Sequence, residues 1–555
     1  MRFHVAIVLS AFLTGPVLAE KPSIDDLLAD LGRDTPGLTF GVVRDGELVY
    51  STSAGMAGLT HSRPFRVETV SNLGSTTKQF TAFAVALLAE RGELSLDDPV
   101  SKYFPDLPDF EHSVTLRHLL SHTSGYREML NTLALAGVRL EKGDYIGHDA
   151  ALDVVRHQPA LQNRPGESWN YNNTGYVMLA RVVEQVSDKS FGDFLDAEVF
   201  TPLGMENTEL RSETGQIIAG RAAGYNPTET GFREVRDLSG ADGAGGLYST
   251  LSDMARWMDH LGEFSIGGQA VREMMTTPYV LNDGESTEYG MGLFIDEIEG
   301  QPRWHHGGAD MGHRSVFVYY PELDSGYMML SNHMGLAGAL PRRMAALFFD
   351  FLAEAEPGDA SDASSDGDSF DPGSLTDEQL ERLTGRYELE KMPGFILSVF
   401  VEDGQLNVQG TNQPAIAVQA TSPITFTAES VGARFEFHVA DDGTVPALTL
   451  HQGQSLKAQR LPDEDTEAPI LTDYVGRYYS PELETVYTLS VEDGALVLDH
   501  RRLRQLPLAP VQDDTFTGAF PVVNVRFERG EDGAVTALYA GNGRTTDIKF
   551  ARWAE

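Results

Sequence analysis

The last third of the chain contains an internal repeat of about 90 residues, which limits the available folds more than any other feature of the sequence. Four short motifs recur in the same order at offsets of 90 or 91 residues. They are Gly385-Arg386-Tyr387 and Gly476-Arg477-Tyr478, Val401-Glu402-Asp403-Gly404 and Val491-Glu492-Asp493-Gly494, Thr425-Phe426-Thr427 and Thr515-Phe516-Thr517, and Asp441-Asp442-Gly443 and Glu531-Asp532-Gly533. Between the motifs, apolar and polar residues alternate and are interrupted by Asp-Gly and Gly turns, which is typical of antiparallel strands. We therefore predict two small antiparallel β-barrels or sandwiches, because two copies are too few for a solenoid.

A low-complexity segment separates this repeat from the rest of the chain. Residues 356–376 consist almost entirely of Pro, Gly, Asp, Ser and Ala, which predicts an acidic flexible linker. With 555 residues the chain exceeds the size at which one hydrophobic core keeps growing. We predict a first domain at 20–355, a β-domain at 377–464 and its repeat at 465–555.

The N-terminus has the pattern of a cleaved leader. Arg2 precedes an apolar run from Val5 to Leu18, and the small residue Ala19 stands before Glu20. This predicts a signal peptide at residues 1–19. A membrane anchor is disfavoured because the run is shorter than the ~20 residues that span a bilayer. We expect an exported protein, periplasmic or secreted, without membrane contact after cleavage.

Composition excludes several classes of partner and cofactor. The chain has 42 Lys and Arg against 82 Asp and Glu, a net charge of -40, which argues against nucleic acid or an anionic membrane as a partner. The absence of cysteine removes disulfides, thiolate metal sites and cysteine nucleophiles. His118 and His122 have a spacing that could serve zinc, but no third ligand stands nearby. We prefer a hydrogen-bonded structural turn for them, and predict neither a metal nor a cofactor.

The first domain mixes strand and helix patterns. Two strand-like runs, 38–43 and 48–50, meet at Asp45-Gly46, a strong hairpin signal. Further patterns predict helices at 146–160, 174–187, 190–199, 251–261 and 340–355, and strands at 316–320 and 327–331.

Ser75 and Lys78 combine a nucleophile with a base one helical turn apart. Residues i and i+3 share a helix face, so the two side chains can meet. A serine hydroxyl needs an adjacent base, and burial lowers a lysine pKa enough for it to serve as one. The helix predicted to follow has an apolar face and a stop at Gly92. That face consists of Phe80, Phe83, Ala84, Leu87 and Leu88. A Ser-x-x-Lys match arises often by chance, so other motifs must support it.

Two further motifs supply that support. Tyr171 and Asn173 stand two apart after a Pro-Gly turn, where an extended loop would direct both side chains the same way. His306-Gly307-Gly308 opens a predicted strand. The neighbouring His305 is an alternative to His306, although the spacing to Gly312 favours His306.

Taken together and in this order, the three motifs resemble those of the penicillin-recognising serine hydrolases. That superfamily includes class C β-lactamases, D-alanyl-D-alanine carboxypeptidases, D-aminopeptidases and related esterases. The resemblance covers about residues 36–352. It implies an α/β fold, with an antiparallel sheet flanked by helices and a helical lobe. The two small antiparallel β-barrel-like domains that follow resemble those of the D-aminopeptidases.

The resemblance also implies catalytic roles. Ser75 would be the acylated nucleophile and Lys78 the base that takes its proton. Tyr171 would assist as a base and deliver a proton to the leaving group. Asn173 would hold Lys78 and the carbonyl side of the substrate.

The third motif would shape the substrate site. His306 stands where β-lactamases have a lysine, which argues against efficient β-lactam hydrolysis because a histidine pairs with a carboxylate only when protonated. Gly308 would let the substrate lie along the strand. The backbone N–H groups of Ser75 and Ala309 would form the oxyanion hole.

These features predict a serine hydrolase acting on a small peptide or ester, with a D-aminopeptidase as the alternative. An aminopeptidase needs an acidic partner for the substrate ammonium. The basic hairpin tip at 499–504 would favour an anion if it reached the site, and is otherwise a solvated hairpin. A non-catalytic binding protein on the same scaffold is a further alternative, and a homodimer formed through the β-domains is left open.

Overall fold

The computed structural model describes residues 22–553, except 237–239, 337–338, 355–374, 391–394, 403, 412–414, 429–430, 432, 441, 452–454, 462–468 and 513. The predicted signal peptide and most of the predicted linker lie outside the described residues. No helix in the described part of the chain is long and apolar enough to cross a membrane.

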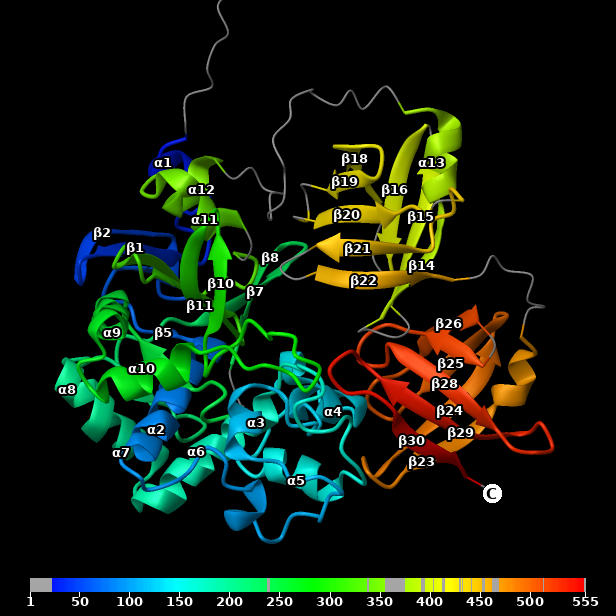
Figure 1. The fold of residues 1–555 in the computed structure, drawn as a ribbon, viewed down its shortest axis with the longest axis horizontal. Helices are drawn as coiled ribbons and strands as arrows, with labels where there is room; N and C mark the ends of the chain where they lie inside the picture. The colour runs from blue at the N-terminus through cyan, green and yellow to red at the C-terminus, as the bar shows by residue number, and fades with distance from the viewer. Residues whose placement is uncertain are drawn as a thin grey trace, which may run out of the picture.

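A six-stranded antiparallel sheet is the centre of the first domain, with the strand order β10-β11-β12-β13-β1-β2 (Figure 1). Its strands are β1 (Leu38–Arg44), β2 (Glu47–Ala54), β10 (Phe294–Ile298), β11 (Gln301–Asp310), β12 (His313–Tyr320) and β13 (Ser325–Ser331). The hairpin predicted at Asp45-Gly46 joins β1 to β2. Strands from both ends of the domain pair in the middle of the sheet, since β1 lies against β13. The sequence segments between them therefore form the helical part.

Helices lie on both sides of this sheet, and a helical lobe extends below it in Figure 1. The helices are α1 (Ile24–Leu27), α2 (Lys78–Glu90), α3 (Leu116–Leu120), α4 (Met129–Leu135), α5 (Ala150–His157), α6 (Asn173–Ser187), α7 (Phe191–Leu195), α8 (Thr201–Leu203), α9 (Leu251–Glu263), α10 (Gly268–Thr276), α11 (Ala339–Ala345) and α12 (Asp350–Glu354). Short strands complete the domain: β3 (Met56–Gly58), β4 (Arg63–Pro64), β5 (Ser71–Asn72), β6 (Glu209–Leu210), β7 (Gly224–Thr228), β8 (Gly231–Val235) and β9 (Leu247–Ser249).

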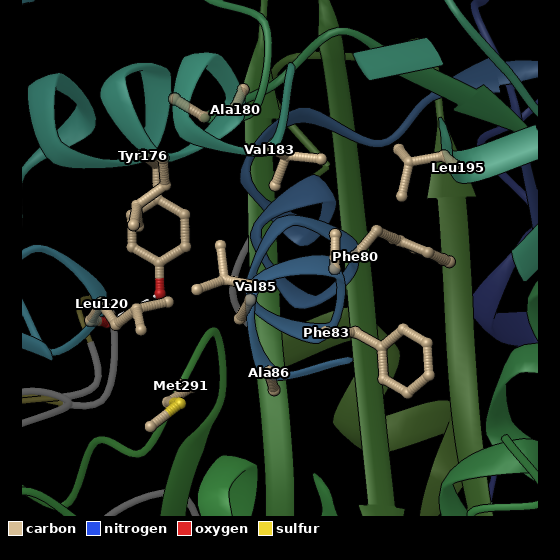
Figure 2. Close-up of a cluster of buried hydrophobic side chains, with 14 of the residues drawn as sticks. Phe80, Phe83, Val85, Ala86, Leu120, Tyr176, Ala180, Val183, Leu195 and Met291 are labelled. Carbon is tan, nitrogen blue, oxygen red and sulfur yellow. Dashed lines mark hydrogen bonds between the residues drawn. The ribbon is translucent and has the colours of Figure 1, made fainter. Parts of the chain in front are cut away.

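Helix α2 passes through the core of this domain. Every residue from Lys78 to Leu88 is buried. The five residues of the predicted apolar face are therefore in the core, and the rest of the helix is enclosed as well. The helix is covered by α6 and by the segment around Met291 (Figure 2). Phe80 also stacks on Trp257 of α9, with ring centroids 4.3 Å apart. A helix enclosed on all sides holds its first residue rigidly.

The helix predicted at 340–355 is two helices, α11 and α12. The chain turns between them, and this turn packs Phe348 against Tyr50 of β2, with ring centroids 4.6 Å apart. The carbonyl of Phe348 also accepts a hydrogen bond from Arg44. Burial of an aromatic side chain outweighs the small gain from continuing a helix.

Both copies of the repeat fold as curled antiparallel sheets, as predicted. The first has the order β17-β16-β15-β14-β22-β21-β20-β19-β18, and its edge strands follow one another in the chain, so the sheet is nearly closed. It contains α13 (Asp377–Leu383), β14 (Gly385–Leu389), β15 (Ile396–Glu402), β16 (Gln405–Gly410), β17 (Ile416–Ala417), β18 (Gln419–Ala420), β19 (Thr425–Ala428), β20 (Ala433–His438), β21 (Ala447–His451) and β22 (Ser455–Arg460).

The second copy is a closed barrel. Its strands are β23 (Gly476–Ser480), β24 (Thr485–Glu492), β25 (Ala495–Asp499), β26 (Leu506–Gln512), β27 (Thr515–Thr517), β28 (Asn524–Arg529), β29 (Val535–Gly541) and β30 (Ile548–Arg552). Pairing of β23 with β30 closes it.

The repeated Gly-Arg-Tyr motif has the same structural role in both copies. Gly385 and Gly476 have φ of +150° and +154°, and an arginine of the last strand lies against each. Each motif tyrosine donates a hydrogen bond to the carbonyl four residues earlier, at 2.9 Å for Tyr387 and 2.8 Å for Tyr478. The motif therefore recurs because it closes the same corner twice.

The closed barrel docks on the helical lobe beside α4 (Figure 1). Tyr487 donates a hydrogen bond of 2.7 Å to the carbonyl of Leu135, which is buried with the apolar core of the barrel. Arg127 and Glu482 form an ion pair across the interface at 2.6 Å, with each side chain 6% exposed.

The basic hairpin tip at 499–504 belongs to this interface. His500 is buried and lies 2.9 Å from the Thr485 hydroxyl, and Arg502 pairs with Asp144 of the first domain. The tip therefore contacts the lobe, and neither alternative considered for it, at the catalytic centre or free in solvent, describes its position.

Candidate active site

Ser75 lies in a short 3-10 helix, Gly74–Thr77, that continues directly into α2. The sequence predicted one regular helix for Ser75 and Lys78. In the tighter 3-10 turn, side chains three apart eclipse one another. Ser75 Oγ lies 3.3 Å from Lys78 Nζ, so the structure brings the predicted nucleophile and base together.

Lys78 is completely buried and its amine has two further partners. Nζ lies 2.8 Å from Asn173 Oδ1 and 2.8 Å from the carbonyl of Ala244. Burial lowers the pKa of Lys78 well below its usual value, and the charge of Arg544 lowers it further, against smaller opposite effects of Glu128 and Asp310. An amine with a lowered pKa can accept a proton near neutral pH.

Asn173 links Lys78 to a carboxylate that the sequence did not single out. Asn173 is the first residue of α6 rather than part of an extended loop, and Asn172 caps the helix. The Nδ2 of Asn173 donates a hydrogen bond to Glu128 Oε1 at 2.7 Å, which turns the Oδ1 of Asn173 toward Lys78. The other oxygen of Glu128 accepts from the backbone N–H of Asn131.

Tyr171 lies across Lys78 with its hydroxyl toward the nucleophile. Lys78 Nζ is 4.8 Å from the centre of the tyrosine ring. Burial raises the pKa of Tyr171, and the Ser75 hydroxyl and the charge of Arg544 only partly oppose this. Tyr171 therefore keeps its proton at neutral pH, which favours proton donation over the role of a base.

Strand β11 separates the two neighbouring histidines. His306 faces Tyr171, with ring centroids 6.1 Å apart, whereas His305 stacks on Phe294 and pairs with Asp296. Successive residues of a strand point to opposite faces, which explains the separation.

The His306 ring is fixed by two hydrogen-bond partners. Its Nδ1 lies 2.7 Å from the carbonyl of Gly307, which can only accept, and Nε2 lies 3.2 Å from the Tyr289 hydroxyl. Burial lowers the pKa of His306 to about 3. His306 is therefore neutral at neutral pH and offers no positive charge to a substrate.

Gly308 and Ala309 lie beside the turn that carries Ser75. A Cβ on Gly308 would be 1.9 Å from the carbonyl of Leu73, so a close approach of the two segments requires glycine there. A Cβ on Gly74 would be 2.7 Å from the Ala309 nitrogen. The backbone of Ala309 thus adjoins Gly74, the residue before Ser75. A direct contact of Gly308 with substrate stays a prediction.

The two histidines considered for zinc have structural contacts. His118 Nδ1 accepts a hydrogen bond from the N–H of Thr115 and caps α3. His122 Nδ1 accepts from the N–H of Asn172, and its ring lies 4.4 Å from that of Tyr171. His122 packs against Tyr171 and belongs to an aromatic cluster with Trp169, Tyr176 and Tyr289.

Sequence patterns missed three residues of the site: Glu128, Tyr289 and Arg544. Each lies far from the motifs in sequence, and none has a spacing that marks it. Arg544 comes from the loop between β29 and β30 of the closed barrel.

The buried histidines should make the folded protein less stable as the pH falls. Burial lowers the pKa of His260 to about 4, and His122 and His306 are also lowered. The unfolded chain then binds more protons than the native state below pH 6.5, so stability falls with decreasing pH. For His260 alone the loss between pH 7 and pH 5 is on the order of 2 kcal/mol.

The check is denaturant unfolding at both pH values. His260→Gln should lower stability at pH 7 but make the loss toward pH 5 smaller than in wild type. An unchanged pH slope in this variant would contradict the assignment.

A deeply buried lysine beside a serine hydroxyl, with a protonated tyrosine over it, is an arrangement suited to a serine hydrolase. The Beta-lactamase family matches residues 24–349, more than half of the chain, and the protein belongs to that family. A Domain of unknown function (DUF3471) matches twice, at 371–464 and 461–551.

Two relatives are similar over most of their length. A D-aminopeptidase of Gluconobacter oxydans is 28% identical over 536 residues, covering 93% of this chain and 96% of that protein. Penicillin-binding protein 4* of Bacillus subtilis is 26% identical over 443 residues, covering 75% of this chain and 93% of that protein. These relationships indicate a serine hydrolase rather than a non-catalytic binding protein.

One solved structure supports the fold. The octameric penicillin-binding protein homologue from Pyrococcus abyssi has a TM-score of 0.54 and 23% identity, covering 79% of this chain and 98% of that one. The predicted fold class, a helix-flanked antiparallel sheet followed by barrel-like domains, is confirmed.

Proposed function

We propose that the protein is an exported serine hydrolase that cleaves a peptide amide or an ester through an acyl-enzyme on Ser75. The observation that carries this proposal is the buried Lys78 amine, 3.3 Å from Ser75 Oγ and held by two other acceptors. Burial lowers the pKa of this amine well below its usual value, and an amine with a lowered pKa beside a serine hydroxyl can take the serine proton.

In the acylation step, neutral Lys78 is the base. Its two N–H groups donate to Asn173 Oδ1 and the Ala244 carbonyl, which leaves its lone pair for the Ser75 proton. Ser75 Oγ then attacks the substrate carbonyl. The N–H groups of Ser75 and Ala309 would stabilise the oxyanion that forms.

Tyr171 is the proton donor for the leaving group. Its hydroxyl donates a proton as the carbon–nitrogen or carbon–oxygen bond breaks, and the proton held by Lys78 replaces it. Water next attacks the acyl-enzyme and gives a proton to Lys78. That proton returns to Ser75 Oγ as the acid is released, so the site is restored.

A D-aminopeptidase is the second candidate. It is supported by the similarity to the Gluconobacter oxydans enzyme across both the catalytic domain and the repeat. The sequence pattern that predicts a leader at residues 1–19 supports the proposal of a periplasmic or secreted location. Assembly into a homodimer is a further proposal that solution measurements of mass would test.

The test compares initial rates of the mature protein and Ser75→Ala on D-alanine p-nitroanilide and p-nitrophenyl butyrate. We expect turnover of at least one substrate, reduced at least about 10³-fold in the variant. Ser187→Ala is the matched control, since Ser187 lies at the far end of α6 and its hydroxyl bonds to the Val183 carbonyl. Turnover of the anilide would establish an aminopeptidase, and turnover of the ester alone an esterase or carboxyl-side peptidase. Absence of Ser75-dependent turnover on both would contradict the proposal.

A further inference from the structure

The closed barrel inserts a loop into the catalytic domain. This loop joins β29 to β30 and spans 542–547. Three residues of the loop form hydrogen bonds with the first domain. Asn542 bonds to Asn131, and Thr545 bonds to Thr132 and to the carbonyl of Glu128. Thr546 bonds to Arg127 and Gln162. The carbonyl of Arg544 accepts from Asn170 Nδ2 at 2.9 Å and from Gln162 Nε2 at 3.2 Å. The backbone at Arg544 is therefore anchored beside the catalytic tyrosine.

The Arg544 side chain extends over the site. Its Cζ lies 4.8 Å from the centre of the Tyr171 ring, on the residue that faces both Ser75 and Lys78. The side chain is exposed, and within the described residues its guanidinium has neither an ion-pair partner nor a hydrogen-bond acceptor. In a chain with a net charge of -40, an arginine without a carboxylate partner at this place is available to a ligand.

The other charged groups of the site are not available to bind a charged ligand as Arg544 is. His306 is neutral, and Lys78 is buried with a lowered pKa. The carboxylate of Glu128 is occupied by Asn173 and the N–H of Asn131. Asp310 accepts from Asn72 and from a backbone N–H. A substrate ammonium would meet the positive Arg544 rather than a free carboxylate.

We propose that Arg544 binds a carboxylate on the leaving group of the substrate, so that the barrel completes the site and selects anionic amides or esters over substrates with a free amine. The proposal rests on the hydrolase function above. Tyr171 protonates the leaving group in that mechanism, and Arg544 stacks on Tyr171, so the two residues address the same part of the substrate. A guanidinium binds a carboxylate with two parallel hydrogen bonds and can stack on an aromatic ring simultaneously.

The experiment uses two thioesters of N-acetyl-D-alanine, one with mercaptoacetate and one with mercaptoacetamide as the leaving group. The two leaving groups have nearly the same size and shape, but the first has a negatively charged carboxylate and the second a neutral carboxamide. In Arg544→Gln, we expect kcat/KM for the mercaptoacetate ester to fall about 10- to 100-fold relative to its neutral partner. Arg544→Lys should restore part of the preference. Arg477→Gln is the matched control, because Arg477 also stacks on a ring of the barrel, 4.6 Å from the centre of Trp553.

An equal effect of Arg544→Gln on both thioesters would overturn the proposal. A binding measurement separates its failure from failure of the hydrolase function. With Ser75→Ala protein, the mercaptoacetate thioester should raise the Tm more than the neutral one, and adding Arg544→Gln should remove the difference. If the wild type shows no Ser75-dependent turnover but this difference is seen, the hydrolase proposal fails and the anion site stands. No difference in Tm overturns the anion site.

Discussion

Replacing Lys78 with methionine should lower kcat/KM by about 10²–10⁴-fold on any substrate whose hydrolysis depends on Ser75. Methionine is apolar and of similar length, so it can occupy the buried space of the lysine. It cannot accept the Ser75 proton. Loss of the Lys78 amine leaves Asn173 Oδ1 and the Ala244 carbonyl without their hydrogen-bond donor, which costs about 1–3 kcal/mol of stability for each buried group. We therefore expect a less stable but folded protein.

The variant Lys78→Arg tests whether a positive charge at this position is enough for activity or whether a base is required. A guanidinium cannot lose its proton in a protein, so this variant should be as inactive as the methionine variant. In wild type, kcat/KM should rise with pH as Lys78 loses its proton and should already be high at neutral pH, because the pKa of Lys78 is well below its usual value. The measurements are steady-state rates from pH 5 to pH 9 and a thermal melt of each variant. Activity of either variant within tenfold of wild type would show that another group is the base.

Breaking the buried ion pair between Arg127 and Glu482 should undock the barrel. Glu482→Ala leaves a buried guanidinium without its partner, and such a change typically costs about 3–5 kcal/mol. Burial raises the pKa of Glu482 more than the adjacent Arg127 lowers it. The cost of removing the two charges from water therefore offsets much of their attraction, so the pair adds little net stability although it is costly to break. Loss of docking would also withdraw Arg544 from Tyr171.

Calorimetry should then show a separate, earlier transition for the barrel, and limited proteolysis should release it. Arg526→Gln is the control, since it breaks the exposed pair with Asp547, whose side chains are 52% and 66% exposed. Exposed pairs contribute at most about 1 kcal/mol. A single unchanged transition in Glu482→Ala would contradict the importance of this contact. A double variant, Arg127→Met with Glu482→Leu, should recover part of the docking because it removes both charges.

Local patterns predicted much of the fold. Hairpin turns, strand alternation and the repeated Gly-Arg-Tyr corner depend on neighbouring residues, and the structure has them at the expected places. The helix at 340–355 was predicted as continuous because its break arises from the packing of Phe348 on a distant strand. The apolar face of helix α2 was predicted from its sequence, but the sequence could not show that α6 and other segments enclose the rest of this helix.

The sequence alone determined the order of the domains, the internal repeat and the residues with catalytic potential, because motif spacing and hydrophobic period are properties of nearby residues. Only the tertiary structure decided which histidine of the pair faces Tyr171 and that Lys78 is completely buried, which lowers its pKa. It also placed Glu128 behind Asn173 and brought Arg544 to the site from more than 370 residues along the chain. Contacts within the first domain depend on how distant segments pack, and the contact of Arg544 depends on how the barrel docks. Both depend on complementary surfaces that no local pattern records.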